Sequence, residues 1–196
     1  MKSFNKPAKT FAEQIELLKA RGMQFANEQD AQFYLEQINY YRLGAYWLPF
    51  EYTHSPHCFK PDTSFEQVLA LYVFDRELRL LILDAIERLE VAVRTRFAYE
   101  LAHRHGCHAY LQGQYFKPTF RWQSLLESLK TEVSRADEVF IEHYKRTYDD
   151  PELPPIWATC EVMSFGQLSK WYQLLAPIQT RKAISSHFDC DEKQFE

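Results

Sequence analysis

The sequence has few glycines and lacks the glycine-rich motifs of common enzyme families. Only 5 of its 196 residues are glycine, which disfavours a sheet-rich fold with many tight turns. It contains no P-loop, no G-x-G-x-x-G and no G-x-S-x-G, so the usual nucleotide-binding and hydrolase signatures are excluded. We therefore expect no cofactor.

Paired cysteines and long apolar runs are also missing. The four cysteines are scattered without a C-x-x-C pair, which is typical of reduced cytosolic thiols. No apolar stretch is long enough to span a membrane, because Asp, Glu or Arg interrupts each one. The lysines of the first ten residues precede no apolar segment, so no signal peptide is visible. We expect a cytoplasmic protein with no membrane partner.

The sequence also lacks an excess of basic residues. The formal net charge is -4, whereas nucleic-acid binders often carry a surplus of Lys and Arg. Any contact with RNA would therefore require a local basic patch.

Aromatic and helix-forming residues are abundant, and they predict an all-α fold. From Phe65 to about His105 there is no Gly or Pro, and apolar residues recur at helical spacing. This segment is expected to form one central helix, or two with a break near Asp75-Arg76. Because it is apolar around much of its circumference, other helices should cover it on several sides. The predicted architecture is a helical bundle around a long central helix.

The segments on either side predict the domain organisation. Thr10 and Glu13 form a capping box, and Asn27 caps a second helix, so residues 1–52 are expected to hold a helical hairpin and an aromatic segment. Thr53–Asp62 is rich in Pro and His and is expected to be a loop. Residues 63–196 would form the main helical domain, possibly continuous with the first.

A polar seam along the long helix is the first candidate for chemistry. Arg76, Glu87 and Arg94 lie nearly in line, and Glu90 and Arg94 form an i,i+4 pair. Because Leu83 and Phe97 share this side, we expect Glu90 and Arg94 to be partly buried and hydrogen-bonded within the chain. The seam is either a structural ladder of ion pairs, which is common, or a functional cluster beside a nucleic-acid site.

Arg96 and His103 are the second candidate, because their seven-residue spacing places both on one helix face. A His can transfer a proton of the ribose 2′-hydroxyl, while an Arg stabilises the charge that develops on phosphorus. The pattern is weak, however. It recurs at Arg181 and His187, and about one such match is expected by chance.

Two stretches rich in His and Cys raise the question of a zinc site built from two loops. His54 and His57 match the paired spacing typical of structural zinc only roughly, and lone loop histidines are usually solvated, so we expect no metal. The residues concerned are His54, His57 and Cys58, and His103, His105, Cys107 and His108.

Several stretches together resemble a known family. They are YYRLGAYWLPF at residues 40–50, YVFDRELR at 72–79, IERLEVAVRTR at 86–96 and LPPIWATCEVMSFGQLS at 153–169. In this order they resemble the Abi-like family of bacterial phage-defence (abortive infection) proteins. The family is similar to the HEPN superfamily, which implies an all-helical fold, an RNA-directed toxic activity and a site often built across a homodimer.

The resemblance also implies where activity would reside. The family's ribonuclease motif is Arg-Asn followed by a Cys-Ala-His stretch, and these 196 residues do not contain it. The resemblance then implies either a shortened product that is a ribonuclease only at full length, or a member that departs from the family. The rival hypothesis is a non-catalytic helical module that binds an RNA or protein partner. The polar positions that match the family are Arg76, Glu90, Arg94 and Glu161.

Overall fold

The protein is helical over most of its described length. The computed structural model describes residue 3, residues 7–117 and residues 120–195. Its helices are α1 (Phe11–Ala20), α2 (Glu28–Gln37), α3 (Tyr40–Trp47), α4 (Phe65–His105), α5 (Phe120–Arg135), α6 (Val139–Thr147), α7 (Ile156–Val162), α8 (Phe165–Leu174) and α9 (Ile178–Ser185), with 3-10 turns at Leu48–Phe50, Ala109–Leu111, Gly113–Tyr115 and Ser186–Phe188. Strands in these residues amount to one short hairpin. The all-α prediction is confirmed.

Two compact units divide the chain, Met1–Leu83 and Asp84–Glu196. Each unit has its own hydrophobic core, and α4 contributes its N-terminal part to the first and its C-terminal part to the second. The domain division expected from the sequence, residues 1–52 and 63–196, stays a prediction.

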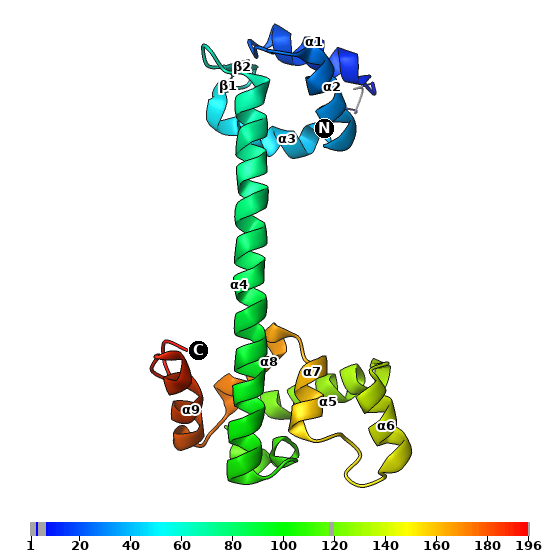
Figure 1. Cartoon of the computed structure of the whole chain (residues 1–196), viewed down its shortest axis with the longest axis vertical. Coiled ribbons are helices and arrows are strands. Elements are labelled where there is room, and N and C mark those ends of the chain that lie inside the picture. Colours follow the sequence, from blue (N-terminus) through cyan, green and yellow to red (C-terminus); the bar gives the residue numbers. More distant parts are fainter. Residues whose placement is uncertain (1–2, 4–6, 118–119, 196) are drawn as a thin grey trace. The chain divides into compact units, whose positions relative to one another are not determined.

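The first unit gathers α1, α2, α3 and the hairpin around the start of α4 (Figure 1). The Thr10–Glu13 capping box that opens α1 is present, with the Glu13 backbone N–H donating to Thr10 Oγ1 at 3.2 Å. The Phe65 backbone N–H donates to the Gln24 carbonyl at 2.9 Å, which ties the start of α4 to the segment after α1. Leu18, Leu35, Leu43, Trp47, Phe65 and Val68 are among the buried residues of this core.

The segment expected to be a loop, Thr53–Asp62, contains most of the β-hairpin instead. Strand β1 (Glu51–His54) pairs antiparallel with β2 (His57–Phe59), and the register shifts between Glu51 and Thr53. Prolines in the sequence suggested a loop. However, Pro56 lies in the two-residue turn between the strands, where it removes no ladder hydrogen bond.

The second unit packs α5, α6, α7, α8 and α9 around the C-terminal part of α4 (Figure 1). At its centre the buried Tyr110 hydroxyl donates to the Pro154 carbonyl at 2.6 Å, and the Tyr110 ring packs edge-on against Trp171. The N–H of Trp122 donates to the Tyr110 carbonyl at 3.2 Å. The polar groups of Tyr110 and Trp122 therefore have partners inside the second unit.

Helix α4 is continuous from Phe65 to His105, so the break considered near Asp75-Arg76 does not occur. The prediction that other helices cover it on several sides is wrong for its middle section. In this section the apolar side chains are exposed on both sides of the boundary between the units, and Leu83 is 60% exposed. Phe97, further along the helix, is fully buried. The exposed set is Val73, Phe74, Leu78, Leu80, Leu81, Ile82, Leu83, Ile86, Leu89 and Val91.

None of the helices in the described parts of the chain combines the length and the apolar character needed to cross a membrane.

Candidate functional site

The last turns of α4 form a local basic segment in an acidic chain. Residues 92–108 hold three Arg, three His and a single Glu, although the whole sequence has a net charge of -4. Residues of this segment point in two directions. Arg94 faces α7, and Arg96, Tyr99 and His103 share another face of the helix.

Arg94 and Glu90 form the partly buried pair expected from their spacing. Arg94 Nη2 lies 2.5 Å from Glu90 Oε1 and donates to the Met163 carbonyl at 2.8 Å. Only 12% of the Arg94 side chain is exposed, against 28% for Glu90. Glu161 Oε2 is 3.8 Å from Arg94 Nη1, so a third family-matched position joins the cluster. These contacts hold α4 against the end of α7.

Arg96 and His103 are brought together by a residue between them, Tyr99. The Arg96 guanidinium carbon lies 5.4 Å from the centre of the Tyr99 ring, and the His103 ring stacks on the same tyrosine with centres 4.0 Å apart. His103 Nδ1 is 2.9 Å from the Tyr99 carbonyl and can donate to it, which leaves Nε2 as the nitrogen free to accept a proton. Tyr99 and His103 are exposed.

Glu100 sits beneath this face and neutralises part of it. Its buried carboxylate lies 2.7 Å from Arg96 Nη2 and 2.6 Å from Arg104 Nε. Two guanidinium groups thus share one carboxylate, and the trio keeps a net positive charge. Neither Tyr99 nor Glu100 was singled out from the sequence, although Glu100 stands at i,i+4 from both Arg96 and Arg104.

Arg76 and Glu161 also match the family and lie apart from the face of Arg96, Tyr99 and His103. Arg76 is exposed on the N-terminal half of α4. Glu161 and the exposed Trp157, both on α7, line a shallow hollow of about 290 Å³ together with Phe140 and Tyr144 of α6. Most of its lining residues are apolar or aromatic, which suits the hollow to a flat ring more than to a phosphate.

The histidines and cysteine after α4 are used within the second unit. Burial, followed by the charge of Arg104, lowers the pKa of His105, whose Nε2 is 2.8 Å from the Thr180 hydroxyl. Cys107 Sγ lies 3.2 Å from His108 Nδ1, and His108 Nε2 lies 3.1 Å from the Leu153 carbonyl. These contacts fix the connection after α4 and gather no group of metal ligands.

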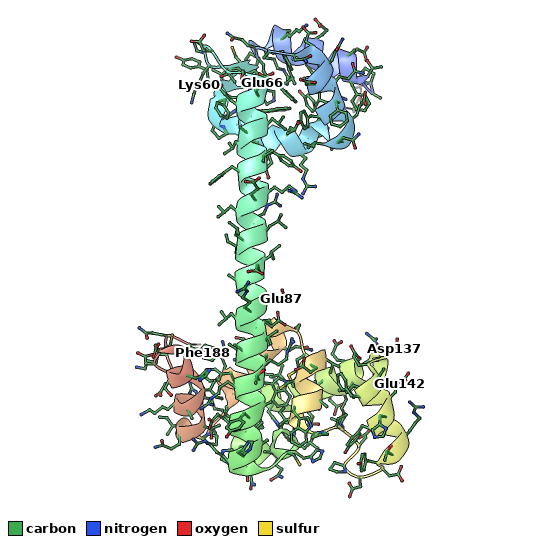
Figure 2. The ribbon with its side chains drawn as sticks, in the orientation of Figure 1. Lys60, Glu66, Glu87, Asp137, Glu142 and Phe188 are labelled. Atoms are coloured by element: carbon green, nitrogen blue, oxygen red, sulfur yellow. The ribbon has the colours of Figure 1, made fainter. Side chains whose placement is uncertain are left out.

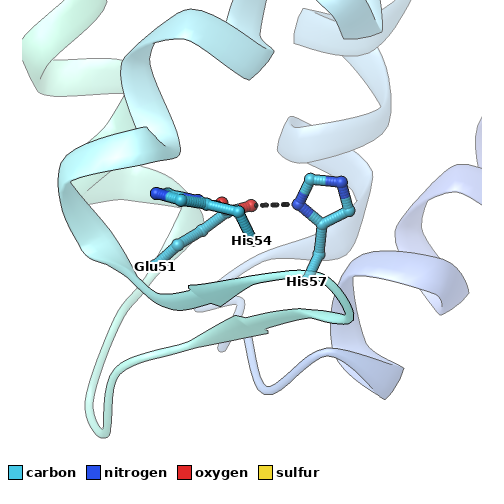
Figure 3. Close-up of side chains that lie close together, drawn as sticks. All are labelled: Glu51, His54 and His57. Atoms are coloured by element: carbon cyan, nitrogen blue, oxygen red, sulfur yellow. Dashed lines mark hydrogen bonds and ion pairs between the residues drawn. The ribbon is translucent and has the colours of Figure 1, made fainter.

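The hairpin of the first unit presents a different constellation, of which the sequence analysis named His54 and His57 but missed Glu51. His54 and His57 both direct Nδ1 at the carboxylate of Glu51, and the His57 contact measures 2.8 Å (Figure 3). Glu51 is buried, whereas both imidazoles are exposed. The signal in the sequence was the regular E-x-x-H-x-x-H spacing, which includes Glu51.

Comparison with known proteins agrees with the family resemblance of the four sequence blocks at residues 40–50, 72–79, 86–96 and 153–169. The model of the family described as "Abi-like protein" matches residues 33–196, which include α4 and every helix of the second unit. No curated protein and no solved structure matches the chain. A family match over most of the chain establishes membership: the chain belongs to the Abi-like family of abortive-infection-type proteins.

Proposed function

We propose that this chain is a phage-defence protein that binds RNA through the exposed face of Arg96, Tyr99 and His103, and that it acts in the cytoplasm. The observation that carries the proposal is the contact of a guanidinium and an imidazole with one half-exposed tyrosine ring. Single-stranded RNA is bound by cationic groups that meet phosphates and by flat rings that stack on bases. This face offers both within two turns of helix.

The charge of the segment supports RNA over an acidic protein surface as the partner. Arg96 and Arg104 keep a net positive charge after Glu100 is counted, and Tyr99 adds the stacking surface that a purely ionic contact would not need. The family relationship supports defence as the setting. A HEPN-like relationship, which the resemblance of the sequence blocks implies, would make RNA the target. Whether this face also cleaves RNA is a separate proposal, tested below.

RNA binding is tested by fluorescence anisotropy with labelled single-stranded RNA. Stacking of one base on an aromatic ring is worth about 1–3 kcal/mol, so Tyr99→Ala should weaken binding by roughly 5- to 150-fold. Tyr148→Ala is the matched control, because Tyr148 is 53% exposed and Tyr99 is 51% exposed in the same unit. Equal affinity of the parent and Tyr99→Ala, or an equal loss in Tyr148→Ala, would contradict the proposal.

The defence role is tested in bacteria challenged with phage. Cells expressing the parent chain should give fewer plaques than cells expressing Tyr99→Ala, at matched protein levels. If both strains give equal protection, RNA binding at this face is not what protects the cell. If the parent gives none against a broad phage panel, the defence role itself fails.

We further propose that a second copy of the chain packs antiparallel on the exposed middle of α4. Arg76 and Glu90 lie seven residues before and after Leu83, and Arg79 and Glu87 lie four residues before and after it. All share one face of the helix with Leu83. A two-fold axis at Leu83 therefore places each Arg opposite a Glu of the partner.

Apolar residues on the same face complete this complementarity. Leu80 and Ile86 flank Leu83 symmetrically, and all three are exposed. Glu87 projects freely from α4 (Figure 2). A row of exposed leucines and isoleucines on one helix is unfavourable in water, and self-association with matched charges would bury it.

A further inference from the structure

We propose that Glu51, His54 and His57 form a binding site for one divalent transition-metal ion, with Zn²⁺ as the best match. The three residues offer one carboxylate oxygen and two imidazole nitrogens, and these atoms lie within 4.8 Å of one another. Zinc binds such atoms at about 2.0–2.2 Å, so three ligand atoms around one ion fall within this spread.

The fold of the hairpin explains why the three side chains meet. His54 and His57 are cross-strand partners at the turn, so their side chains lie on the same face of the two strands. Residues three apart in a regular strand point to opposite faces, which would send Glu51 away from His54. The register shift between Glu51 and Thr53 turns the strand locally and brings Glu51 onto the histidine face.

The burial of the Glu51 carboxylate favours a bound cation. Its side chain has no exposed surface, whereas the side chains of His54 and His57 are 65% and 44% exposed. A buried carboxylate is costly unless a positive charge or several donors face it. Within the described part of the chain its ion-pair partners are these two imidazoles, which are also the commonest ligands of zinc.

The donor set selects the class of ion. Two nitrogens and one carboxylate oxygen suit Zn²⁺ and other late first-row ions, whereas Mg²⁺ and Ca²⁺ prefer all-oxygen sites. Cys58 lies between His57 and the buried Phe59, and its thiol points to the Phe59 carbonyl at 3.8 Å, so no thiolate completes the set. Three protein ligands leave a coordination position for water or a small ligand.

The surroundings of the site add a space that such a ligand could occupy. His57 also lines a cavity of about 1170 Å³ in the first unit, together with Arg21 and Tyr40. Arg21 donates to the Tyr40 hydroxyl at 2.8 Å, which holds a cationic group at this cavity. His57 therefore borders a cavity that also contains the Arg21 guanidinium.

The test is metal binding by the purified full chain after treatment with EDTA and dialysis. Zn²⁺ should bind in a one-to-one ratio in calorimetry and in competition with a chromogenic chelator, and Mg²⁺ should not compete. Loss of an outer-shell partner costs about 10- to 100-fold in metal affinity, so loss of a ligand in His54→Ala or His57→Ala should cost at least about 100-fold. His143→Ala, which removes an exposed histidine of α6, should bind Zn²⁺ like the parent.

Two controls keep the proposal falsifiable. Both histidines are exposed, so their alanine variants should keep the helical circular dichroism of the parent, and a loss of binding can then be assigned to the site. Cobalt substitution should give visible absorption bands typical of low-coordinate Co²⁺ that disappear in His57→Ala. If Zn²⁺ does not bind one-to-one, or if the variant lacking both histidines binds it as tightly as the parent, the three residues form only a carboxylate–imidazole cluster and the proposal fails.

Discussion

The guanidinium of Arg94 donates to the carbonyl of Met163 at 2.8 Å, although the two residues are 69 positions apart in the chain. Met163 is the C-cap residue that follows Val162 at the end of α7, where backbone carbonyls lack partners within the helix. Arg94 also forms an ion pair with Glu90 of the same helix. Its side chain therefore contacts both Glu90 of α4 and the end of α7. This contact makes Arg94 a structural residue of the second unit.

Replacing Arg94 with Ala should destabilise the second unit by about 3 kcal/mol. The change leaves the Glu90 carboxylate and the Met163 carbonyl without their partner in a place where only 12% of the Arg94 side chain reached solvent. Urea denaturation followed by circular dichroism measures the loss. Arg88→Ala is the control, because Arg88 makes the same i,i+4 contact with Asp84 but is 79% exposed, and it should cost less than about 1 kcal/mol. If the two variants lower the free energy of unfolding equally, the contacts of Arg94 stabilise the fold no more than an exposed ion pair does.

Alkaline pH should destabilise the second unit, in two steps. Burial raises the pKa of the Cys160 thiol, and burial likewise raises the pKa of the Tyr110 hydroxyl against the opposing effect of its hydrogen bond with Thr159. Both groups therefore lose their protons at higher pH in the folded state than in the unfolded chain. Their contribution is complete below the unfolded pKa values, about 8.5 for Cys and about 10 for Tyr, and it falls as pH rises above them.

The expected slope is about 1.4 kcal/mol per pH unit for each group, measured by urea denaturation between pH 7 and about 11. Cys160→Ala should remove the first step and Tyr110→Phe the second, whatever either variant does to stability at neutral pH. Cys58→Ala serves as the control, because Cys58 is exposed. A flat profile above pH 9, or a first step that persists in Cys160→Ala, would count against the assignment.

Local sequence signals predicted the helices well and the sites only in part. The absence of Gly and Pro between Phe65 and His105 was sufficient to predict α4, and the i,i+4 spacing was sufficient for Glu90 and Arg94. Met163 as a partner of Arg94 could not be predicted, because the contact depends on how α7 packs.

The hairpin and the exposed middle of α4 could not be predicted, for different reasons. Residues 51–59 contain a strand signal masked by Pro56, and the alignment of Glu51 with the two histidines depends on a register shift that leaves no clear mark in the sequence. The apolar pattern of α4 correctly indicated surfaces that require burial. It could not tell a covering helix of the same chain from a surface left exposed, as at Leu83.

The proposed antiparallel dimer predicts a specific charge exchange. Arg79→Glu places a Glu opposite Glu87 of the partner at two symmetric positions, and should weaken the dimer by about tenfold or more. Adding Glu87→Arg restores opposite charges and should restore association. Sedimentation equilibrium measures each dissociation constant, with Arg88→Glu, further from the face of Leu83, as the control. A monomeric parent chain, or a double variant no better than the single one, would refute this geometry.

The chain should not cleave RNA in the absence of metal. Metal-free cleavage requires a proton-transfer group and an available cation at one phosphate. His103 can supply the first, because its contact with the Tyr99 carbonyl leaves Nε2 free to accept a proton. Arg96 is separated from His103 by the Tyr99 ring and held by the buried Glu100 carboxylate, with Nη2 2.7 Å from Oε1, so it is not placed to supply the second at the phosphate that His103 would reach. The assay is incubation of mixed-sequence RNA with the purified chain in EDTA, and the parent should match His103→Ala at background cleavage. Cleavage by the parent that is lost in His103→Ala but kept in His143→Ala would instead make Arg96 and His103 a catalytic pair.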